Sequence, residues 1–432
     1  MPALIVIGLL VLVLSAVPVA AVLGILSFIL DEITMDGRLT AGLAEIYWDK
    51  SKEFILVAVP MFILLGEIML RAGIARRMYG AVIQWLSWLP GGLMHANIGS
   101  CTIFAASSGS SVATAATVGT VAYPEIKTRK YNERLFLGSL AAGGTLGILV
   151  PPSINLILYG LLTDTSVPEL YLAGIIPGLI LSGLFMATII GACLYRRSWG
   201  GTRIRTSWGQ RIRTLPHLLP PLILFAAVVG SIYGGVATPT EAASIGVVMA
   251  LIIAACFRTL SFKMLREAFE GTMRTTAMIM LIVFAAIFLN FVLGFMGITQ
   301  AMLNFIAALG LTPIQTIYLI VLFYLILGMF METLSMMLTT IPIVFPIVMR
   351  LGVPEFSDVW FGILITLLME AALITPPIGV NLYVVHGIRT RGGKFNDVAI
   401  GAIPFVFAML AMIVLLISAP YLATWLPTLV YH

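Results

Sequence analysis

The stretch Gly147-Ile-Leu-Val-Pro-Pro-Ser-Ile-Asn155 places a proline pair inside a segment that is otherwise apolar enough to cross a membrane. The stretch Leu373-Ile-Thr-Pro-Pro-Ile-Gly-Val-Asn381 repeats this arrangement 225 positions later. A polar, helix-weakening stretch precedes each pair, Ser107-Ser-Gly-Ser-Ser111 and Glu332-Thr-Leu-Ser335, again with a separation of 225. Proline removes a backbone donor and clashes with the preceding turn, so each pair predicts a break in its helix. Such breaks are tolerated in a bilayer only where they are buried in protein or line a cavity. A duplicated set predicts a secondary transporter built from two repeats.

The composition indicates a membrane protein. Of the 432 residues, 60% are apolar and 10% are charged, and the mean hydropathy is +1.08. Soluble domains carry about 25% charged residues. Several windows reach the ~20 predominantly apolar residues that cross the hydrocarbon core, among them 54–70, 171–195, 218–236 and 277–296. We therefore expect an all-α polytopic membrane protein, with the lipid bilayer as its surroundings.

Basic residues gather in five short segments, which hold 19 of the 24 lysines and arginines. Positively charged loops stay on the cytoplasmic side of a membrane, so these segments orient the chain. Their position between apolar segments argues against a nucleic-acid partner. The segments are Arg71–Arg77, Lys127–Arg134, Arg196–Arg213, Arg258–Arg266 and Arg389–Lys394.

With these clusters inside, residues 1–213 form a first repeat of span, span, hairpin, broken span and span. The apolar stretch 4–30 is expected to be a retained first helix, because it lacks the basic n-region of a signal peptide. Segment 96–125 has basic clusters on both sides, so it is expected to enter the membrane and return as a re-entrant hairpin. Residues 135–163 then form a helix that is broken at Pro151-Pro152.

The second half repeats this order with the opposite orientation. Residues 214–237 are expected to form a linking helix, and residues 238–432 the second repeat. Its hairpin is predicted at 313–350 and its broken helix at 360–388. The predicted architecture is an inverted repeat with two re-entrant helical hairpins and two broken helices.

The hairpin tips and the breaks are the candidate binding segments. The small residues Ser107–Ser111 let backbones approach closely and leave hydroxyls and carbonyls free at the tip, and hard cations prefer such oxygen ligands. Each break frees carbonyls near an Asn, Asn155 or Asn381, and the half-helix that follows presents a positive dipole end to an anion. The alternatives are small-residue helix packing for the tip and a structural kink for the breaks.

Carboxylates inside membrane segments are functional candidates by default. Glu332 is either a ligand at the second hairpin tip or a residue near the outer water boundary. Glu370, which precedes the second break, has the same two interpretations. Glu67 lies one turn before the predicted cytoplasmic boundary, where its side chain is expected to reach water.

No sequence feature indicates an enzyme. The chain has no Walker A sequence, no His-Glu-x-x-His pair and no Gly-rich dinucleotide fingerprint. The cysteines Cys101, Cys193 and Cys256 are isolated in apolar surroundings, which favours a packing role over metal binding or a disulfide.

The motifs together resemble the large membrane (M) subunit of tripartite ATP-independent periplasmic (TRAP) transporters, within the wider ion transporter superfamily. They occur in the family's order and spacing over nearly the whole chain. One departure is Thr114, where many similar proteins carry Asp. The matching stretches are Leu89–Leu93, Ala106–Ala113, Ala142–Ser153, Ala173–Gly178, Tyr233–Ala243 and Leu373–Gly379.

The resemblance implies an elevator-type, sodium-driven importer of a small organic acid, such as a C4-dicarboxylate. It implies a periplasmic substrate-binding protein and a small four-helix membrane subunit as partners, and no cofactor apart from sodium as the coupling ion. Sodium is expected at two sites, each formed by a hairpin tip and a broken helix, with the solute between them. The implied ion- and solute-binding residues are Ser107, Ser108, Gly109, Ser110, Ser111, Pro151, Pro152, Ser153 and Asn155 in the first half, and Glu332, Thr333, Ser335, Thr339, Thr375, Pro376, Pro377, Gly379 and Asn381 in the second.

Two alternatives remain at this point. One is a sodium–dicarboxylate symporter of the same superfamily that works without a binding protein. The other belongs to a different class, a membrane scaffold without transport activity or an intramembrane enzyme. The sequence does not name the solute, the number of sodium ions or the oligomeric state.

Overall fold

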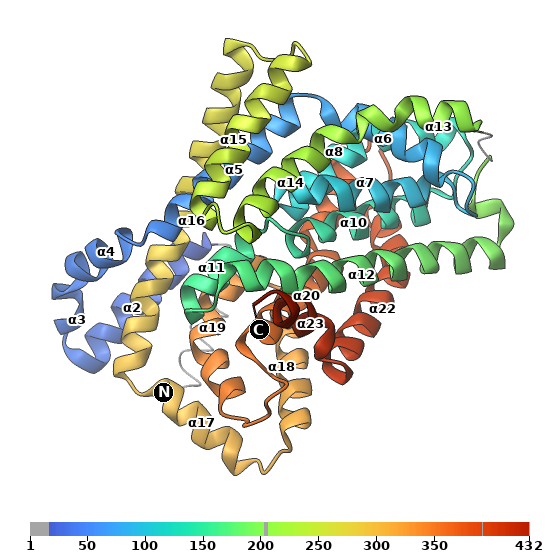
Figure 1. Cartoon of the computed structure of the whole chain (residues 1–432). Helices are drawn as coiled ribbons and strands as arrows, with labels where there is room; N and C mark the ends of the chain where they lie inside the picture. The colour runs from blue at the N-terminus through green and yellow to red at the C-terminus, as the bar shows by residue number, and fades with distance from the viewer. Residues whose placement is uncertain (1–16, 203–205, 391, 432) are drawn as a thin grey trace.

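The computed structural model describes residues 17–202, 206–390 and 392–431 (Figure 1). Within these ranges the regular structure is helical, apart from one isolated β-bridge between Tyr131 and Gly200. Five of the described helices are long and apolar enough to cross a membrane, and up to seven spans result if two bent helix pairs each count as one. The prediction of an all-α protein with several apolar helices is confirmed.

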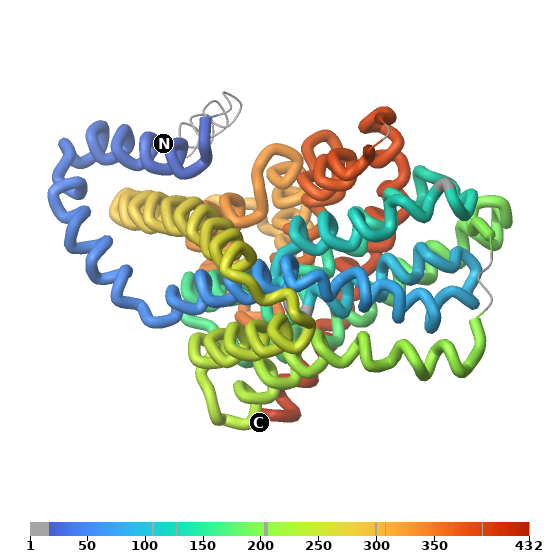
Figure 2. Tube along the Cα trace, turned by 90° about the horizontal axis from the view of Figure 1, so that it is seen from above, coloured from blue at the N-terminus to red at the C-terminus, as the bar shows by residue number. Residues whose placement is uncertain are grey.

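One group of helices forms an outer layer. Helix α16 packs along α2 and α5, and α5 also packs along α15. Figure 2 shows α16 lying beside α2, apart from most of the other helices. The elements of this part are α2 (Val19–Met35), α3 (Arg38–Ala41), α4 (Leu43–Ser51), η1 (Phe54–Val57), α5 (Ala58–Arg71), α14 (Leu219–Tyr233), α15 (Pro239–Cys256) and α16 (Phe262–Phe295).

A second group surrounds two helices that are buried along nearly their whole length, α10 (Glu133–Leu149) and α20 (Asp358–Ile374). Helix α10 contacts α20 and also lies against helices from both halves of the chain. A helix that is apolar on all sides belongs in the interior of a bundle. The helices around this pair are α7 (Leu93–Ser108), α8 (Ser111–Ala122), α11 (Ile154–Thr163), α12 (Val167–Tyr195), α18 (Pro313–Leu327), α19 (Thr333–Met349), α21 (Val380–Gly387), α22 (Phe395–Ser418) and α23 (Tyr421–Tyr431).

Several local expectations need correction. The amphipathic helix α6 (Ile74–Leu86) follows the Gly73 turn, where the sequence analysis places only a basic loop. Helix α17 (Ile298–Ala308) was also not expected, and α16 begins fifteen residues before the predicted apolar window 277–296. The first predicted helix, 4–30, lies partly outside the described residues. The remaining short elements are α9 (Glu125–Thr128), η2 (Arg197–Trp199), α13 (Trp208–Thr214) and η3 (Leu215–His217).

The two halves of the chain meet where α10 crosses α22. A Cβ atom on Gly138 would overlap the Gly401 carbonyl, so the two backbones are in direct contact. Small residues permit this approach between membrane helices. Ion pairs lie next to this contact, at the N-terminal end of α10. Arg389 Nη2 lies 2.8 Å from Glu133 Oε1, and Arg134 Nε lies 3.0 Å from Asp397 Oδ1.

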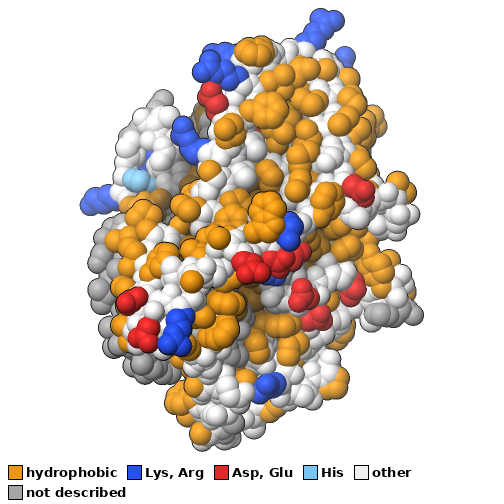
Figure 3. Space-filling model, turned by 90° about the vertical axis from the view of Figure 1, so that its left-hand side faces the viewer, with side chains coloured by type: hydrophobic (Ala, Val, Ile, Leu, Met, Phe, Trp, Pro, Cys, Tyr) orange, Lys and Arg blue, Asp and Glu red, His pale blue; other side chains and the backbone are white. Residues whose placement is uncertain are grey.

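Hydrophobic side chains cover most of the face seen in Figure 3, and charged side chains are confined to a few places on it. Exposed residues of this kind include Phe28 and Ile29 on α2 and Leu281 on α16. Such extended apolar surface is compatible with lipid rather than water. The relative orientation of the two predicted repeats in a membrane stays a prediction.

Candidate functional site

The first hairpin reverses direction at Ser107–Ser111, which we call the first tip. Helix α7 ends at Gly109, which adopts a left-handed conformation with φ +58°. Ser110 caps α8 by accepting a hydrogen bond from the Ala113 N–H. The Ser108 hydroxyl lies 2.7 Å from that of Thr114, which itself donates to the Ser110 carbonyl at 2.8 Å. The polar groups of the tip therefore bond to one another.

The first tip rests on the first break, Val150–Ser153, which separates α10 from α11. The two helices meet at an angle of 43°. A Cβ atom on Gly109 would lie 3.0 Å from the Pro152 carbonyl, and one on Gly147 would lie 2.6 Å from the Ser110 carbonyl. Only glycine at these two positions allows the tip and the break to pack this closely.

The second hairpin packs on the helix that precedes the second break. The second tip, Gly328–Glu332, joins α18 to α19, and the second break, Thr375–Gly379, separates α20 from α21. Glu332 caps α19, because its carboxylate accepts hydrogen bonds from the Ser335 N–H at 3.4 Å and the Ser335 hydroxyl at 3.0 Å. A Cβ atom on Gly328 would overlap the Ala372 side chain, so this hairpin packs directly on α20.

A cavity of about 720 Å³ lies between these segments and the outer layer. Ligand pockets for small molecules measure roughly 300–1,000 Å³. Helices α2, α5 and α16 line the cavity, and so do both tips and residues that flank the two breaks, such as Asn155 and Val380. The predicted site residues that line it are Ser108, Gly109, Ser110, Ser111, Asn155, Glu332, Thr333 and Ser335.

Four helices begin at this cavity. The lining includes Ser111 at the start of α8, Ile154 of α11, Thr333 of α19 and Val380 of α21. The first N–H groups of a helix have no partner inside the helix, and the macrodipole makes this end positive, so helix N-termini favour anions. The side-chain nitrogen of Asn155 is buried at the same place and has no hydrogen-bond partner. The cavity therefore offers donors and positive dipole ends to a negatively charged group.

The sequence of this chain is similar to those of known transport proteins. Residues 6–422 match the family model described as "Tripartite ATP-independent periplasmic transporter, DctM component". The C4-dicarboxylate TRAP transporter large permease protein DctM of Rhodobacter capsulatus is 32% identical over 452 residues, covering 99% of both chains. The protein of the same name from Vibrio cholerae is 30% identical, covering 96% of this chain and 94% of the relative.

The chain belongs to the TRAP large permease family. It is therefore a subunit of a multi-pass membrane transporter and not an enzyme. Relatives of similar identity differ in the solute that they are named for. The ectoine/5-hydroxyectoine large permease UehC of Ruegeria pomeroyi is 31% identical, covering 87% of this chain and 86% of the relative.

A solved structure shares the fold. The structure of the Alcanivorax borkumensis YdaH transporter matches with a TM-score of 0.64 and 15% identity, and it covers 98% of both chains. At this level of identity the likeness concerns the fold alone.

In this TRAP large permease, the remaining predicted site residues whose side chains the structure describes do not line the cavity. Thr339 and Thr375 donate hydrogen bonds to the Ser335 and Ala371 carbonyls within their own helices. Asn381 is fully buried and donates to the Ala141 carbonyl at 3.2 Å. The side chain of Ser107 lies outside the described part of the chain. The others that do not line the cavity are Pro151, Pro152, Ser153, Pro376, Pro377 and Gly379.

The hydroxyls of the first tip that the structure describes take part in hydrogen bonds within the protein, and the prediction that they bind an ion stays a prediction. Ser108, Ser110 and Ser111 each make a hydrogen bond within the protein. The physical reason is that a hydroxyl inside a membrane protein costs free energy unless it is bonded. The polar side chains that line the cavity include those of Glu67, Ser110, Asn155 and Glu332.

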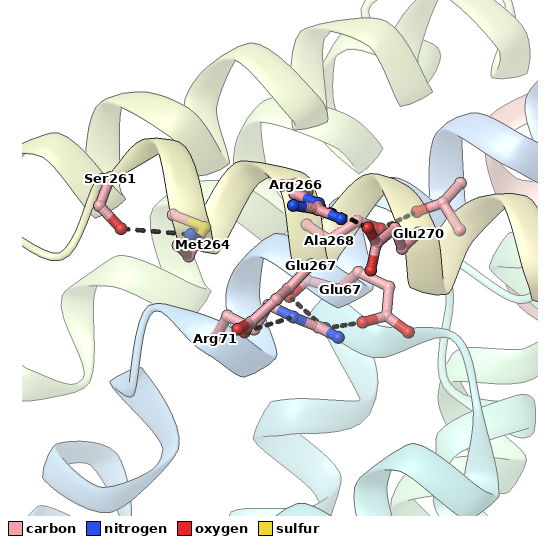
Figure 4. A network of polar contacts seen from close by, with 9 residues as sticks. Glu67, Arg71, Ser261, Met264, Arg266, Glu267, Ala268 and Glu270 are labelled. Carbon is pink, nitrogen blue, oxygen red and sulfur yellow. Dashed lines mark hydrogen bonds and ion pairs between the residues drawn. The ribbon is translucent and has the colours of Figure 1, made fainter.

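The sequence analysis did not anticipate the position of Glu67. Its carboxylate lines the cavity and pairs with Arg71 one turn later, and Arg71 Nε also lies 3.8 Å from Glu267 Oε2 on α16 (Figure 4). Figure 4 shows Arg71 between the two glutamates. The spacing of Glu67 and Arg71 by four residues was the available signal, since such pairs meet on one helix face.

Glu370 is the other residue whose role the sequence left open. It is fully buried and meets Ser111, a residue of the other half of the chain.

Proposed function

We propose that this protein is the large subunit of a sodium-coupled secondary importer, which takes up a small organic acid across the bacterial inner membrane. The observation that carries the proposal is the convergence of four helix N-termini on one cavity, at Ser111, Ile154, Thr333 and Val380. A carboxylate is the group that such a set of positive helix ends favours. The solutes named for the relatives vary, so the proposal commits to the class of solute and not to one compound.

Sodium coupling rests on the chemistry of the two tips and breaks. Interrupted helices leave carbonyl oxygens without helical partners, and oxygen is the ligand that hard cations prefer. Carboxylate Glu332 adds negative charge at the second tip. Sodium that ordered a tip would raise the affinity for the solute, and by reciprocity the solute would raise the affinity for sodium.

Movement of one helix group against the other is the proposed transport step. The cavity is lined by the outer layer, with Gly66 and Glu67 of α5, and by the tips and the residues that flank the breaks. We infer an elevator mechanism in which the tip-and-break unit carries the solute past the static outer layer. A small membrane subunit would support that layer, and a periplasmic binding protein would deliver the solute.

Reconstitution into proteoliposomes tests this proposal. The large subunit, its small membrane partner and the binding protein are combined, and uptake of the solute found by thermal-shift screening of that binding protein is followed. We expect uptake to require an inward sodium gradient. Uptake that persists without sodium contradicts the coupling, and full uptake without the binding protein favours the independent symporter.

A double variant tests the site. Ser110→Ala with Asn155→Ala is expected to abolish sodium-driven uptake while the protein remains folded. The matched control is Ser418→Ala with Asn304→Ala, since both residues are exposed and distant from the cavity lining. Undiminished uptake in the first pair contradicts the assignment of this site.

A further inference from the structure

The segment that joins the two predicted repeats presents apolar side chains on its surface. Helix α13 and the η3 turn after it expose Trp208, Ile212 and Leu215, with exposed fractions of 69%, 62% and 41%. Spacings of four and three residues place these side chains on one helix face. We call them the α13 stripe. Helix α13 packs on α6 (Figure 1), and the stripe is the part of its surface that this packing leaves uncovered.

The α13 stripe continues into a helix surface that faces lipid. Helix α14 follows after a bend of 46°, and the two helices together are apolar and long enough to count as one bent span. The first turns of α14 expose Leu219, Leu222 and Ile223. Exposed aliphatic side chains on a membrane-spanning helix contact lipid chains rather than water. The stripe therefore lies at the end where this span leaves the membrane.

Positive charge accompanies the α13 stripe. Residues 196–218 contain six arginines and no aspartate or glutamate. Helix α13 itself carries Arg211 and Arg213, and Arg213 is exposed. The Arg211 guanidinium lies 4.9 Å from the centre of the Trp208 ring, and its Nε donates a hydrogen bond to the Thr206 hydroxyl at 3.3 Å. The cation–π contact and the hydrogen bond hold Arg211 beside the stripe.

These arginines have no acidic partner within the described chain. Among the described residues of segment 196–218, no arginine forms an ion pair. Each of the other four basic segments has an ion-paired arginine, and these are Arg71, Arg129, Arg266 and Arg389. Water alone can solvate a surface arginine, but water does not account for an exposed tryptophan, isoleucine and leucine beside it.

An anionic phospholipid matches this combination of charge and apolar surface. A helix with arginine on one face and tryptophan and aliphatic residues on another lies in the plane of the membrane interface. Tryptophan is enriched at that depth, and basic residues next to a span are attracted to anionic headgroups. A nucleic acid would supply phosphates for the arginines but no acyl chains for the stripe.

We propose that α13 is a membrane-surface anchor that binds anionic phospholipid. Arg211 and Arg213 contact the headgroup phosphates, and the α13 stripe enters the acyl-chain region beside the start of α14. Because α13 lies between the two predicted repeats and packs on α6, the anchor holds the linking segment at one face of the membrane. The proposal concerns lipid only, so it holds whether or not uptake is coupled to sodium.

Quenching of tryptophan fluorescence by brominated lipid tests the anchor. The full chain is reconstituted into bilayers of equal amounts of phosphatidylcholine and phosphatidylglycerol, and in each sample only one of the two lipids carries bromine. The chain has seven tryptophans, so the emission of Trp208 is taken as the difference between the wild type and Trp208→Phe. We expect brominated phosphatidylglycerol to quench this emission at least about twofold more strongly than brominated phosphatidylcholine, because basic side chains at a membrane concentrate anionic lipid. The double variant Arg211→Gln with Arg213→Gln should quench equally with both lipids.

Trp425 on α23 is the matched control. It is 54% exposed, and residues 419–432 contain no lysine or arginine. Its emission, obtained in the same way with Trp425→Phe, should be quenched equally by the two brominated lipids.

Three results would overturn the proposal. Equal quenching of Trp208 by both lipids would show that the headgroup is not recognised. Absence of quenching by either lipid would show that the α13 stripe does not enter the membrane. Loss of quenching when the small membrane subunit is added would show that a protein covers the stripe. If Trp208→Phe does not fold, the total emission of the wild type and of the double arginine variant still decides, because the difference between the two lipids must shrink in the variant.

Discussion

The two breaks share a proline pair and a spacing, yet they lie in different surroundings. In the first, Pro151, Pro152 and Ser153 are buried, and the Ser153 hydroxyl caps α11. In the second, Pro377 and Ile378 are exposed, and α21 begins at Gly379 without a side-chain cap. The first break is held on all sides by protein, whereas the second is partly open. A duplicated motif therefore does not imply two equivalent sites.

The two asparagines differ in the same sense. Asn155 lines the cavity with a buried side-chain nitrogen that has no protein partner, and Asn381 uses that nitrogen to bond the Ala141 carbonyl of α10. Asn155 therefore offers a free donor at the cavity. Asn381 holds the second break against the first half, and its Oδ1 is buried without a partner. Substitutions can separate the role of Asn155 from that of Asn381.

Gly147→Ala is expected to have the largest effect, because it disturbs the contact between the first tip and the first break. The new methyl group would lie 2.6 Å from the Ser110 carbonyl and 2.9 Å from the Ser111 nitrogen. Overpacking of this kind costs about 1–3 kcal/mol, which outweighs the helix preference for alanine of about 1 kcal/mol. Thermal unfolding in detergent and the uptake assay measure the loss.

Gly183→Ala is the matched control, since a Cβ atom there meets nothing within 4 Å. It should unfold at the same temperature as the wild type or at a higher one. Equal behaviour of the two alanine variants would show that the tip and the break do not pack as described.

Substitutions of the two asparagines are expected to have intermediate effects. Asn381→Ala should lower the free energy of unfolding by about 1 kcal/mol, because a buried hydrogen bond is lost. Asn155→Ala removes a buried group with an unpaired nitrogen, so it should leave stability unchanged and weaken apparent solute or sodium affinity instead. Chemical denaturation measures the free energy of unfolding, and uptake at a series of solute and sodium concentrations measures the apparent affinities. If Asn155→Ala lowers stability and Asn381→Ala weakens affinity, the two breaks have the opposite roles.

The caps of the two tips give the smallest expected effect. A glutamine at position 332 still accepts the two bonds from Ser335, so Glu332→Gln should change stability by only a few tenths of a kcal/mol, whereas Glu332→Ala should cost about 1 kcal/mol. Ser110→Ala should resemble the latter, since it also removes a cap. A loss of stability in Glu332→Gln equal to that in Glu332→Ala would mean that the charge, and not the cap, supports the second tip.

Local chemistry explains why much of the fold was predictable. Helices α10 and α20 end close to the proline pairs that the sequence indicated, because two adjacent prolines remove two backbone donors. Single prolines, such as Pro177 and Pro404, lie inside helices of this chain. Helices α6 and α17 were missed for the opposite reason. Both are short, and α6 carries Arg76 and Arg77, so hydropathy alone assigned that region to a loop.

Side-chain partners were less predictable than helix ends. The small residues of the first tip indicated oxygen ligands, but the hydroxyls that the structure describes there are engaged within the protein. Little in the sequence indicated that Glu67 on α5 lines the cavity. A single acidic residue near the end of a helix has several ordinary explanations.

By itself, the sequence determined that this chain is a helical membrane protein and that its helices break at the two proline pairs. These properties depend on composition and on the backbone chemistry of single residues. Only the tertiary structure decided which polar groups face the cavity and that Glu370 meets Ser111 across 259 positions of chain. Such contacts depend on how helices pack, and no pattern within one segment carries that information.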